Sequence, residues 1–316
     1  MGKNQLSIQT IMSIVKKKDA FLMEYAQSAH APRVYEDIMC LLNEILSGRI
    51  SVQKATGLLS VYYVLLTEEK EITIREVFYR CKRVFSHQNH VIKALECIKK
   101  RTQLELQNVV PGNKGLVNGA CTIEREGEAI EIKHTTVIPR IRPGDRLIAA
   151  SRVVLVVEKE AVFNEIVQKK ARLEEVLGEP AIIVTGKGYP CRNTLLFLMM
   201  ASNMQVFGLF DCDPHGLCIY TVYKHGSRRN PALKVPGIKR IGVFLHDLQE
   251  RGESLQEITE ERQLSLVKNL LARHRELGND INIMEKTRKK ASIEDISGSR
   301  EIAEYVAQKI RRSESG

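Results

Sequence analysis

Apolar residues recur at three- and four-residue intervals up to about residue 130, and this spacing predicts amphipathic helices. Helices are expected at residues 11–27, 35–47, 51–66, 73–85 and 90–106. Gly48 stands where a left-handed residue would end the second of them. The Gly- and Pro-rich stretch 111–119 is a candidate hairpin. Three successive helices and a small hairpin are typical of a winged helix-turn-helix, which places a helix in the DNA major groove.

The pattern changes from about residue 150, where short apolar strands alternate with helices. The expected strands are at residues 153–157, 181–185, 206–210 and 241–244. Helical patterns at 159–177 and 192–202 lie between them. This alternation predicts an α/β domain whose mostly parallel sheet is covered on both faces. The turn-rich segment 134–147 is the expected linker, so we expect domains at residues 1–133 and 134–316.

Composition narrows the class of protein. The 316 residues are enough for two domains of ordinary size. The chain has 48 Lys and Arg against 38 Asp and Glu, a net charge of +10, which favours an acidic partner such as nucleic acid. No apolar run approaches the roughly 18 residues of a membrane span, so no membrane partner is expected. The seven cysteines lack the spacing of a zinc site or redox pair, so free thiols are expected.

Acidic residues directly follow two of the expected strands. Glu158 comes after the strand at 153–157, and Asp211 and Asp213 follow the strand at 206–210. Ligands of open α/β sheets bind beyond the carboxyl ends of the strands, so these acids converge if the strands are neighbours. Three oxygen ligands suit Mg²⁺ or Mn²⁺, which would also relieve their mutual repulsion. The alternative for each acid alone is a solvated loop or a helix cap.

The loop GKGYP follows the expected strand at 181–185 and would reach the same edge of the sheet. Its glycine amides and the side chain of Lys187 are candidates for a phosphate cradle. A Gly-Lys-Gly loop combined with acids after two strands is a more specific signal of a metal site than the Asp-x-Asp pair alone.

A second candidate centre lies in the fourth expected helix. Thr73 and Glu76 have the spacing of a capping box, which places the helix start at Thr73. Arg75 precedes Tyr79 by four residues and lies on the same helical face. A tyrosine hydroxyl has a pKa near 10 and is a poor nucleophile, but positive neighbours favour its phenolate. The alternative is that Tyr79 is a half-buried core aromatic beside Phe78.

Six short segments occur in order along the chain. They are REVFYR (75–80), KGLVNG (114–119), VVEKEAVF (156–163), TGKGYP (185–190), DCDPHG (211–216) and YKHGS (223–227). Together they resemble the meiotic double-strand-break transesterases, which are related to the A subunit of topoisomerase VI. The resemblance extends from about residue 50 to residue 296, and it departs from the family pattern at Cys191 and Arg192. It implies a CAP-like winged-helix domain with a nucleophilic tyrosine and a toprim domain that binds a metal ion.

The resemblance also implies a reaction. Tyr79, assisted by Arg75, would displace a DNA 3′-hydroxyl and become linked to the 5′-phosphate. Glu158, Asp211 and Asp213 would hold Mg²⁺, with Mn²⁺ as the alternative cofactor. The expected DNA contacts are Lys159, Lys187 and Lys224.

The implied partner is double-stranded DNA, cut by a homodimer in which the tyrosine of one protomer works beside the metal of the other. Such composite sites would initiate meiotic recombination in the nucleus, with other recombination factors and an ATPase-like B-type subunit as further expected partners. One alternative is the A subunit of a type IIB topoisomerase that works with an ATPase. Others are a non-catalytic DNA-binding scaffold and a toprim nuclease that uses metal-activated water.

Overall fold

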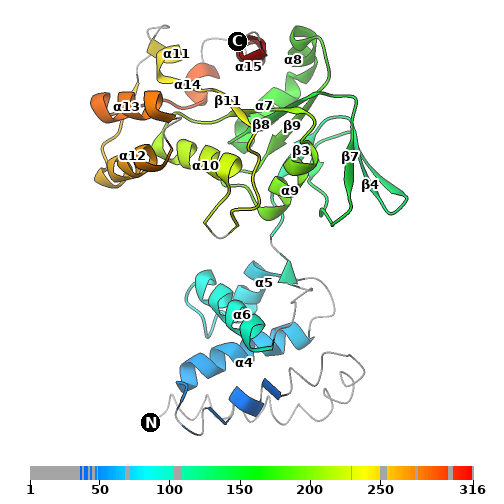
Figure 1. Cartoon of the computed structure of the whole chain (residues 1–316), viewed down its shortest axis with the longest axis vertical. Coiled ribbons are helices and arrows are strands. Elements are labelled where there is room, and N and C mark those ends of the chain that lie inside the picture. Colours follow the sequence, from blue (N-terminus) through cyan, green and yellow to red (C-terminus); the bar gives the residue numbers. More distant parts are fainter. Residues whose placement is uncertain are drawn as a thin grey trace. The chain divides into compact units, whose positions relative to one another are not determined.

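The computed structural model describes residues 36–314, apart from residues 38, 42, 45–46, 48, 68–71, 103–108, 111, 229, 250–254, 275–276 and 298–301. The helix expected at 11–27 and Gly48 therefore lie outside the described residues, and the helix expected at 35–47 lies only partly within them. The chain divides into two compact units, Met1–Gly112 and Asn113–Gly316. Figure 1 shows the elements of both units.

The first unit is helical, with a small apolar core. The elements with described bounds are α4 (Val52–Thr67), β1 (Ile72–Thr73), α5 (Ile74–Arg80), α6 (Gln88–Thr102) and β2 (Val109–Val110). The three helices contact one another, and β1 pairs in parallel with β2. Val61, Val77 and Ile98 are fully buried, one from each helix, so their shared core fixes the position of α5.

The second unit is built on a six-stranded sheet in the order β11-β10-β8-β9-β3-β6. Its strands are β3 (Leu116–Asn118), β6 (Thr136–Val137), β8 (Val153–Val157), β9 (Ala181–Thr185), β10 (Gln205–Leu209) and β11 (Lys239–Gly242). The four strands β11, β10, β8 and β9 are parallel, whereas β3 and β6 are antiparallel to their neighbours. The prediction of an α/β domain with a mostly parallel sheet is confirmed, and β8 and β9 have the predicted bounds.

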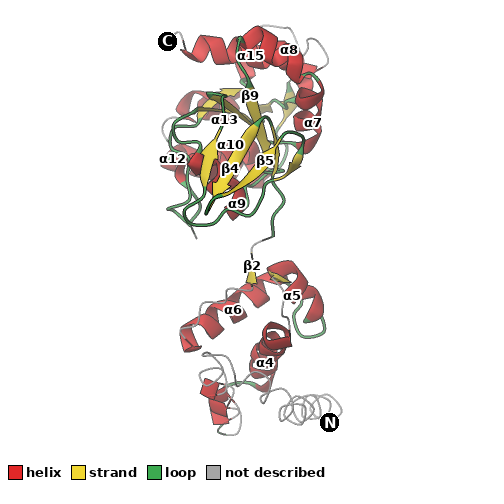
Figure 2. Cartoon of the chain, turned by 90° about the vertical axis from the view of Figure 1, so that its right-hand side faces the viewer, coloured by secondary structure: helices red, strands yellow, loops and turns green. Residues whose placement is uncertain are grey.

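Helices and small sheets surround this central sheet (Figures 1 and 2). The helices are α7 (Glu160–Gln168), α8 (Lys170–Leu177), α9 (Arg192–Met200), α10 (Pro214–His225), α11 (Leu245–Gln249), α12 (Glu261–Arg273), α13 (Gly278–Thr287), α14 (Glu294–Ser297) and α15 (Ile302–Glu314). Strands β4 (Cys121–Arg125), β5 (Glu128–Ile132) and β7 (Arg146–Ile148) form an antiparallel sheet, and β12 (Gln256–Glu257) pairs with β13 (Lys289–Lys290). The single helix expected at 159–177 is instead the pair α7 and α8, which meet at Lys169.

Burial explains why the central strands are continuously apolar. Every residue of β8 and of β9 is buried, because helices pack on both faces of a parallel sheet. Helices α7, α8 and α15 pack against one another, while α10 packs against α12 and α12 against α13. None of the helices in the described part of the chain is long and apolar enough to cross a membrane.

The stretch predicted as a winged-helix hairpin belongs to the second unit instead. Its residues Leu116–Asn118 form β3, which pairs with β6 and β9. The division between the units accordingly follows Gly112, whereas we expected it after residue 133. At Gly119 φ is +141°, and a Cβ would lie 2.9 Å from the Cα of Ile182. The glycine therefore allows two strands to approach closely, which the sequence pattern does not distinguish from a turn.

Candidate active site

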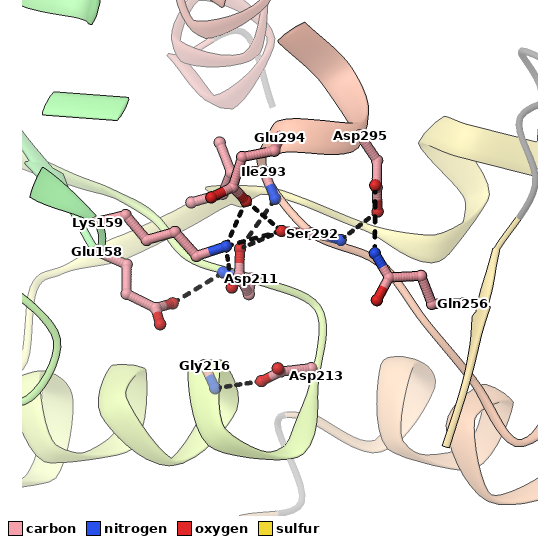
Figure 3. A network of polar contacts seen from close by, with 10 residues as sticks. All are labelled: Glu158, Lys159, Asp211, Asp213, Gly216, Gln256, Ser292, Ile293, Glu294 and Asp295. Carbon is pink, nitrogen blue, oxygen red and sulfur yellow. Dashed lines mark hydrogen bonds and ion pairs between the residues drawn. The ribbon is translucent and has the colours of Figure 1, made fainter. Parts of the chain in front are cut away.

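Glu158 and Asp211 lie side by side at the carboxyl ends of β8 and β10. The two strands are adjacent and parallel, with Val157 opposite Leu209, so the predicted meeting of acids at one sheet edge holds for this pair. One carboxylate oxygen of Glu158, Oε2, accepts a hydrogen bond from the backbone N–H of Asp211 at 3.0 Å (Figure 3). Both residues are buried, with exposed fractions of 7% and 6% for the whole residue.

Asp213 belongs to the same turn, but its carboxylate caps α10. Its Oδ1 accepts a hydrogen bond from the backbone N–H of Gly216 at 2.6 Å. The cap that we considered as an alternative for each acid is thus present at Asp213. Within the described residues, no three His, Cys, Asp or Glu side chains are grouped as a metal site. The expected convergence of three acids is therefore present only as a close pair with Asp213 beside it.

The two buried acids have raised pKa values. Burial is the main cause at Glu158, and the charge of Asp211 adds to it, raising the pKa of Glu158 to about 7. Burial also raises the pKa of Asp211, opposed by hydrogen bonding from Lys159 and from the backbone N–H of Ile293. Negative charge at this edge is therefore only partly compensated by the chain itself.

Lys159 provides that partial compensation. Its ammonium Nζ lies 2.8 Å from Asp211 Oδ2, donates to Ser292 Oγ at 2.7 Å, and also pairs with Glu294 (Figure 3). We expected Lys159 to face DNA phosphate. In the structure its ammonium pairs with two carboxylates, because Lys159 is the cap residue before α7 and lies beside Asp211. Its contact with DNA phosphate stays a prediction.

The donor chemistry of this edge fits a divalent metal ion. Two buried carboxylates meet there, and burial together with the charge of Asp211 raises the pKa of Glu158, so a bound cation would stabilise its charged form. Mg²⁺ prefers carboxylate oxygens of this kind. Glu158 and Asp211, with Asp213 next to them, are the residues that would hold it.

The pKa of Glu158 leads to a pH-dependent prediction. An acid whose pKa rises from 4.5 in the unfolded chain to about 7 in the folded one binds protons more tightly when folded, so its contribution to stability is present at low pH and is lost as pH rises toward 7. Between pH 5 and 8, the free energy of unfolding of the wild type should fall by about 2 kcal/mol relative to Glu158→Gln. Urea unfolding of both proteins in magnesium-free buffer measures this difference. Parallel pH profiles would contradict the assignment.

Tyr79 lies at the surface of the first unit. It is 52% exposed, and its ring centroid lies 5.7 Å from that of Phe78, so Tyr79 lies at the edge of the core with its ring open to solvent. Arg75 Nε and Nη2 donate hydrogen bonds to the Tyr79 hydroxyl at 3.3 and 3.2 Å, and the guanidinium lies 5.6 Å from the ring centroid. The predicted four-residue spacing therefore places a cation on the phenol oxygen.

The capping box predicted from Thr73 and Glu76 is present and fixes the start of this helix. The Thr73 hydroxyl accepts from the Glu76 backbone N–H at 3.2 Å, and the Glu76 carboxylate accepts from the Thr73 backbone N–H at 2.6 Å. Val77, two residues before the tyrosine, is fully buried and anchors α5 to the core. Together these contacts turn Tyr79 and Arg75 toward solvent.

Comparison with known proteins gives a family match in each of the two units. Residues 153–310 match the toprim-domain family of the topoisomerase 6 A subunit and Spo11. Residues 51–108 match the family "Type IIB DNA topoisomerase". The chain is also 31% identical over 250 residues to the "Probable meiosis-specific protein SPO11 homolog" of Encephalitozoon cuniculi, an alignment that covers 73% of this chain and 80% of that protein.

The chain belongs to the topoisomerase VI A subunit/Spo11 family. It is 32% identical to the "Meiotic recombination protein rec12" of Schizosaccharomyces pombe, with 63% of this chain and 59% of that one aligned. It is 30% identical to the human "Meiotic recombination protein SPO11", with 66% and 56% aligned. The alignments thus cover somewhat more than half the length of these two relatives. The second unit contains the family's toprim domain at residues 153–310, as the resemblance implied, and toprim domains in general bind Mg²⁺.

The loop that carries Lys187 lies beside the acid pair of the toprim domain. Gly188 donates its backbone N–H to the carbonyl oxygen of Glu158 at 2.9 Å, and Lys187 itself has a positive φ of 53°. The Lys187 ammonium pairs with Glu160 Oε1 at 2.8 Å. The predicted phosphate loop therefore lies at the sheet edge that carries Glu158 and Asp211, which we call the acid edge. Its lysine forms an ion pair with Glu160.

Lys224 lies elsewhere. It is in the last turn of α10, at the opposite end from the cap Asp213, and donates to the Tyr220 hydroxyl at 3.1 Å. Eleven residues of helix separate the two ends by about 16 Å. Lys224 is therefore not part of the acid edge, and its contact with DNA stays a prediction.

Sequence reasoning assigned no role to the segment Ala291–Glu294, although it completes the site. The backbone N–H of Ile293 donates to Asp211 Oδ1 at 2.9 Å, and Cys212 and Ala291 exchange two backbone hydrogen bonds at 2.9 and 3.0 Å. The sequence did contain a signal for a helix start in this segment, because Ser292 is followed three residues later by Asp295, which is the spacing of a capping pair. The Ser292 backbone N–H indeed donates to Asp295 at 2.7 Å.

The family departure at Cys191 and Arg192 lies at the start of α9. Cys191 precedes the helix with its sulfur 3.2 Å from Thr194 Oγ1, and Arg192 is exposed in the first turn. All seven cysteines are free thiols, as the spacing predicted.

Proposed function

We propose that this chain cleaves double-stranded DNA by transesterification and thereby initiates meiotic recombination, with Tyr79 as the nucleophile. The observation that carries the proposal is the exposed Tyr79 hydroxyl, hydrogen-bonded to Arg75 at the surface of a capped helix. Membership of the family and the meiotic names of the relatives support it.

In the proposed step the Tyr79 oxygen forms a bond to a backbone phosphorus of DNA. The bond between that phosphorus and the 3′-oxygen breaks, the phenol gives up its proton, and the departing oxygen takes a proton to become a 3′-hydroxyl. One ester replaces another, so this step needs no ATP. The Arg75 guanidinium favours the phenolate and offsets phosphate charge in the transition state.

The acid edge of the toprim domain has a complementary role. Glu158 and Asp211, with Asp213, would bind Mg²⁺, and Mn²⁺ would serve as well because both ions prefer oxygen ligands. The bound ion supplies charge stabilisation at the phosphate. The loop of Lys187 lies at the same sheet edge, and the Lys187 side chain would contact phosphate of the same DNA strand.

The proposal includes a homodimer, in which the tyrosine of one protomer acts with the acids of its partner, and a location in the nucleus. Location of the nucleophile and the acids on separate compact units supports an arrangement shared between chains. Other recombination factors and a B-type, ATPase-like subunit are proposed as further partners.

The test is covalent capture of DNA. Full-length protein is incubated with end-labelled duplex DNA and Mg²⁺, stopped with denaturant and analysed for label that migrates with protein. We expect adducts on 5′ ends only. Cleaved DNA with free 5′ phosphates and no adduct would instead support a nuclease that uses metal-activated water, and uncleaved DNA under all conditions would support a scaffold.

The match of residues 51–108 to type IIB topoisomerases favours one alternative, an A subunit that works with an ATPase. That alternative predicts ATP-dependent relaxation of supercoiled DNA once an ATPase partner is added. Cleavage without relaxation favours the meiotic function.

A further inference from the structure

Both oxygens of the Asp211 carboxylate are occupied by groups of this chain. Oδ1 accepts the Ile293 backbone N–H at 2.9 Å, and Oδ2 lies 2.8 Å from the Lys159 ammonium. The side chain of Asp211 is 8% exposed and that of Lys159 is 30% exposed. A protein cation therefore already lies on the acid that the proposed function assigns to a metal ion.

The same ammonium is shared with a second carboxylate from a distant part of the chain. Lys159 pairs with Glu294, which is 51% exposed, and donates to Ser292 Oγ at 2.7 Å. Figure 3 shows Lys159 between Asp211 and the turn that carries Ser292 and Glu294. Lys159 thus has one partner in the buried acid pair and another at the solvent-facing rim.

We propose that Lys159 is an internal counter-ion, which neutralises Asp211 while no divalent ion is bound and shifts to Glu294 when one binds. The inference rests on the proposed function, because it takes Asp211 as a metal ligand. It assigns to Glu294, which lies within the stretch of family resemblance, a part in cation binding that the sequence alone did not suggest.

The physical reason is competition between like charges. A divalent ion at Asp211 would be repelled by an ammonium group in contact with the same carboxylate. The lysine side chain has four rotatable methylenes and three donors, so it can keep its bond to Glu294 while leaving Asp211. Glu294 therefore provides a carboxylate with which Lys159 can stay paired while the incoming ion binds Asp211.

This arrangement predicts opposite effects for the two partners. Lys159→Met removes the competing charge and keeps the aliphatic stem, so Mn²⁺ affinity should rise by about tenfold. Glu294→Gln removes the alternative partner and leaves Lys159 on Asp211, so affinity should fall by about threefold or more. A purely structural role for the ion pair would lower the affinity in both variants.

The measurement is Mn²⁺ binding to the full-length protein without DNA, followed by the electron paramagnetic resonance signal of free Mn²⁺. The matched controls are Lys169→Met and Glu165→Gln. Each breaks the ion pair between Lys169 Nζ and Glu165 Oε1, which lie 3.1 Å apart, and each changes the net charge by the same amount as the corresponding test variant. Asp211→Asn identifies the site, because it should lose the binding. Thermal melting of each variant checks that it is folded.

Affinities that rise in Lys159→Met and fall in Glu294→Gln, with unchanged controls, support the counter-ion role. Unchanged affinities in both variants, or a fall in both, would overturn it while leaving the metal site intact. Wild-type protein that binds no Mn²⁺, or Asp211→Asn that binds it as well as wild type, would overturn the metal site itself.

Discussion

Tyr79→Phe should lower covalent capture of DNA by at least about a thousandfold, because the nucleophilic oxygen is the single atom removed. The ring is 52% exposed and its hydroxyl contacts Arg75 at the surface, so the variant should fold and bind DNA as the wild type does. Denaturing gels of end-labelled DNA measure the adduct, and gel mobility shifts measure DNA binding.

Arg75→Gln provides the graded comparison. It leaves the nucleophile in place but removes the cation that contacts it, so adduct formation should fall by about a hundredfold and not vanish.

Adducts formed by Tyr79→Phe at the wild-type rate would show that another group attacks DNA.

Mixing two inactive variants should restore cleavage of one DNA strand. In a heterodimer of Tyr79→Phe and Asp211→Asn, one composite site lacks both groups and the other has an intact tyrosine and an intact acid. An equal mixture that exchanges freely contains about half heterodimers, and these should nick supercoiled DNA without breaking both strands. Agarose gels that separate nicked from linear DNA record the result.

Each variant alone should give neither product. If each protomer carried its own complete site, the mixture would be as inactive as its components. Linear DNA from the mixture would also contradict a composite arrangement, because a heterodimer has only one working site.

The sequence predicted the central strands well because continuous burial leaves a strong local signal in the chain. The runs at β8 and β9 are apolar throughout, and the structure has every one of their residues buried. Neighbouring strands then bring Glu158 and Asp211 together, which follows from the rule that parallel strands end at one edge. The capping box of Thr73 and Glu76 likewise depends only on residues three apart.

Contacts between distant segments were not predictable in this way. Lys159 and Glu294 are far apart in sequence, and nothing in either local pattern shows that one ammonium serves two carboxylates. The end of the first unit was misplaced for a similar reason, because Gly119 reads as a turn but allows β3 to pass close to β9. Pairing between strands from different parts of the chain decides such cases, and spacing alone does not encode it.

The exposed phenol of Tyr79 in the first unit is the group proposed to join DNA, and a peptide measurement tests this most directly. Trypsin should release Glu76–Arg80 from the denatured protein as a peptide whose only tyrosine is Tyr79. After reaction with Mg²⁺ and nuclease trimming, mass spectrometry should find this peptide bearing a 5′-linked nucleotide, and chelation of the metal should abolish it. A nucleotide found on any other peptide, or on none while DNA is cut, would contradict the account.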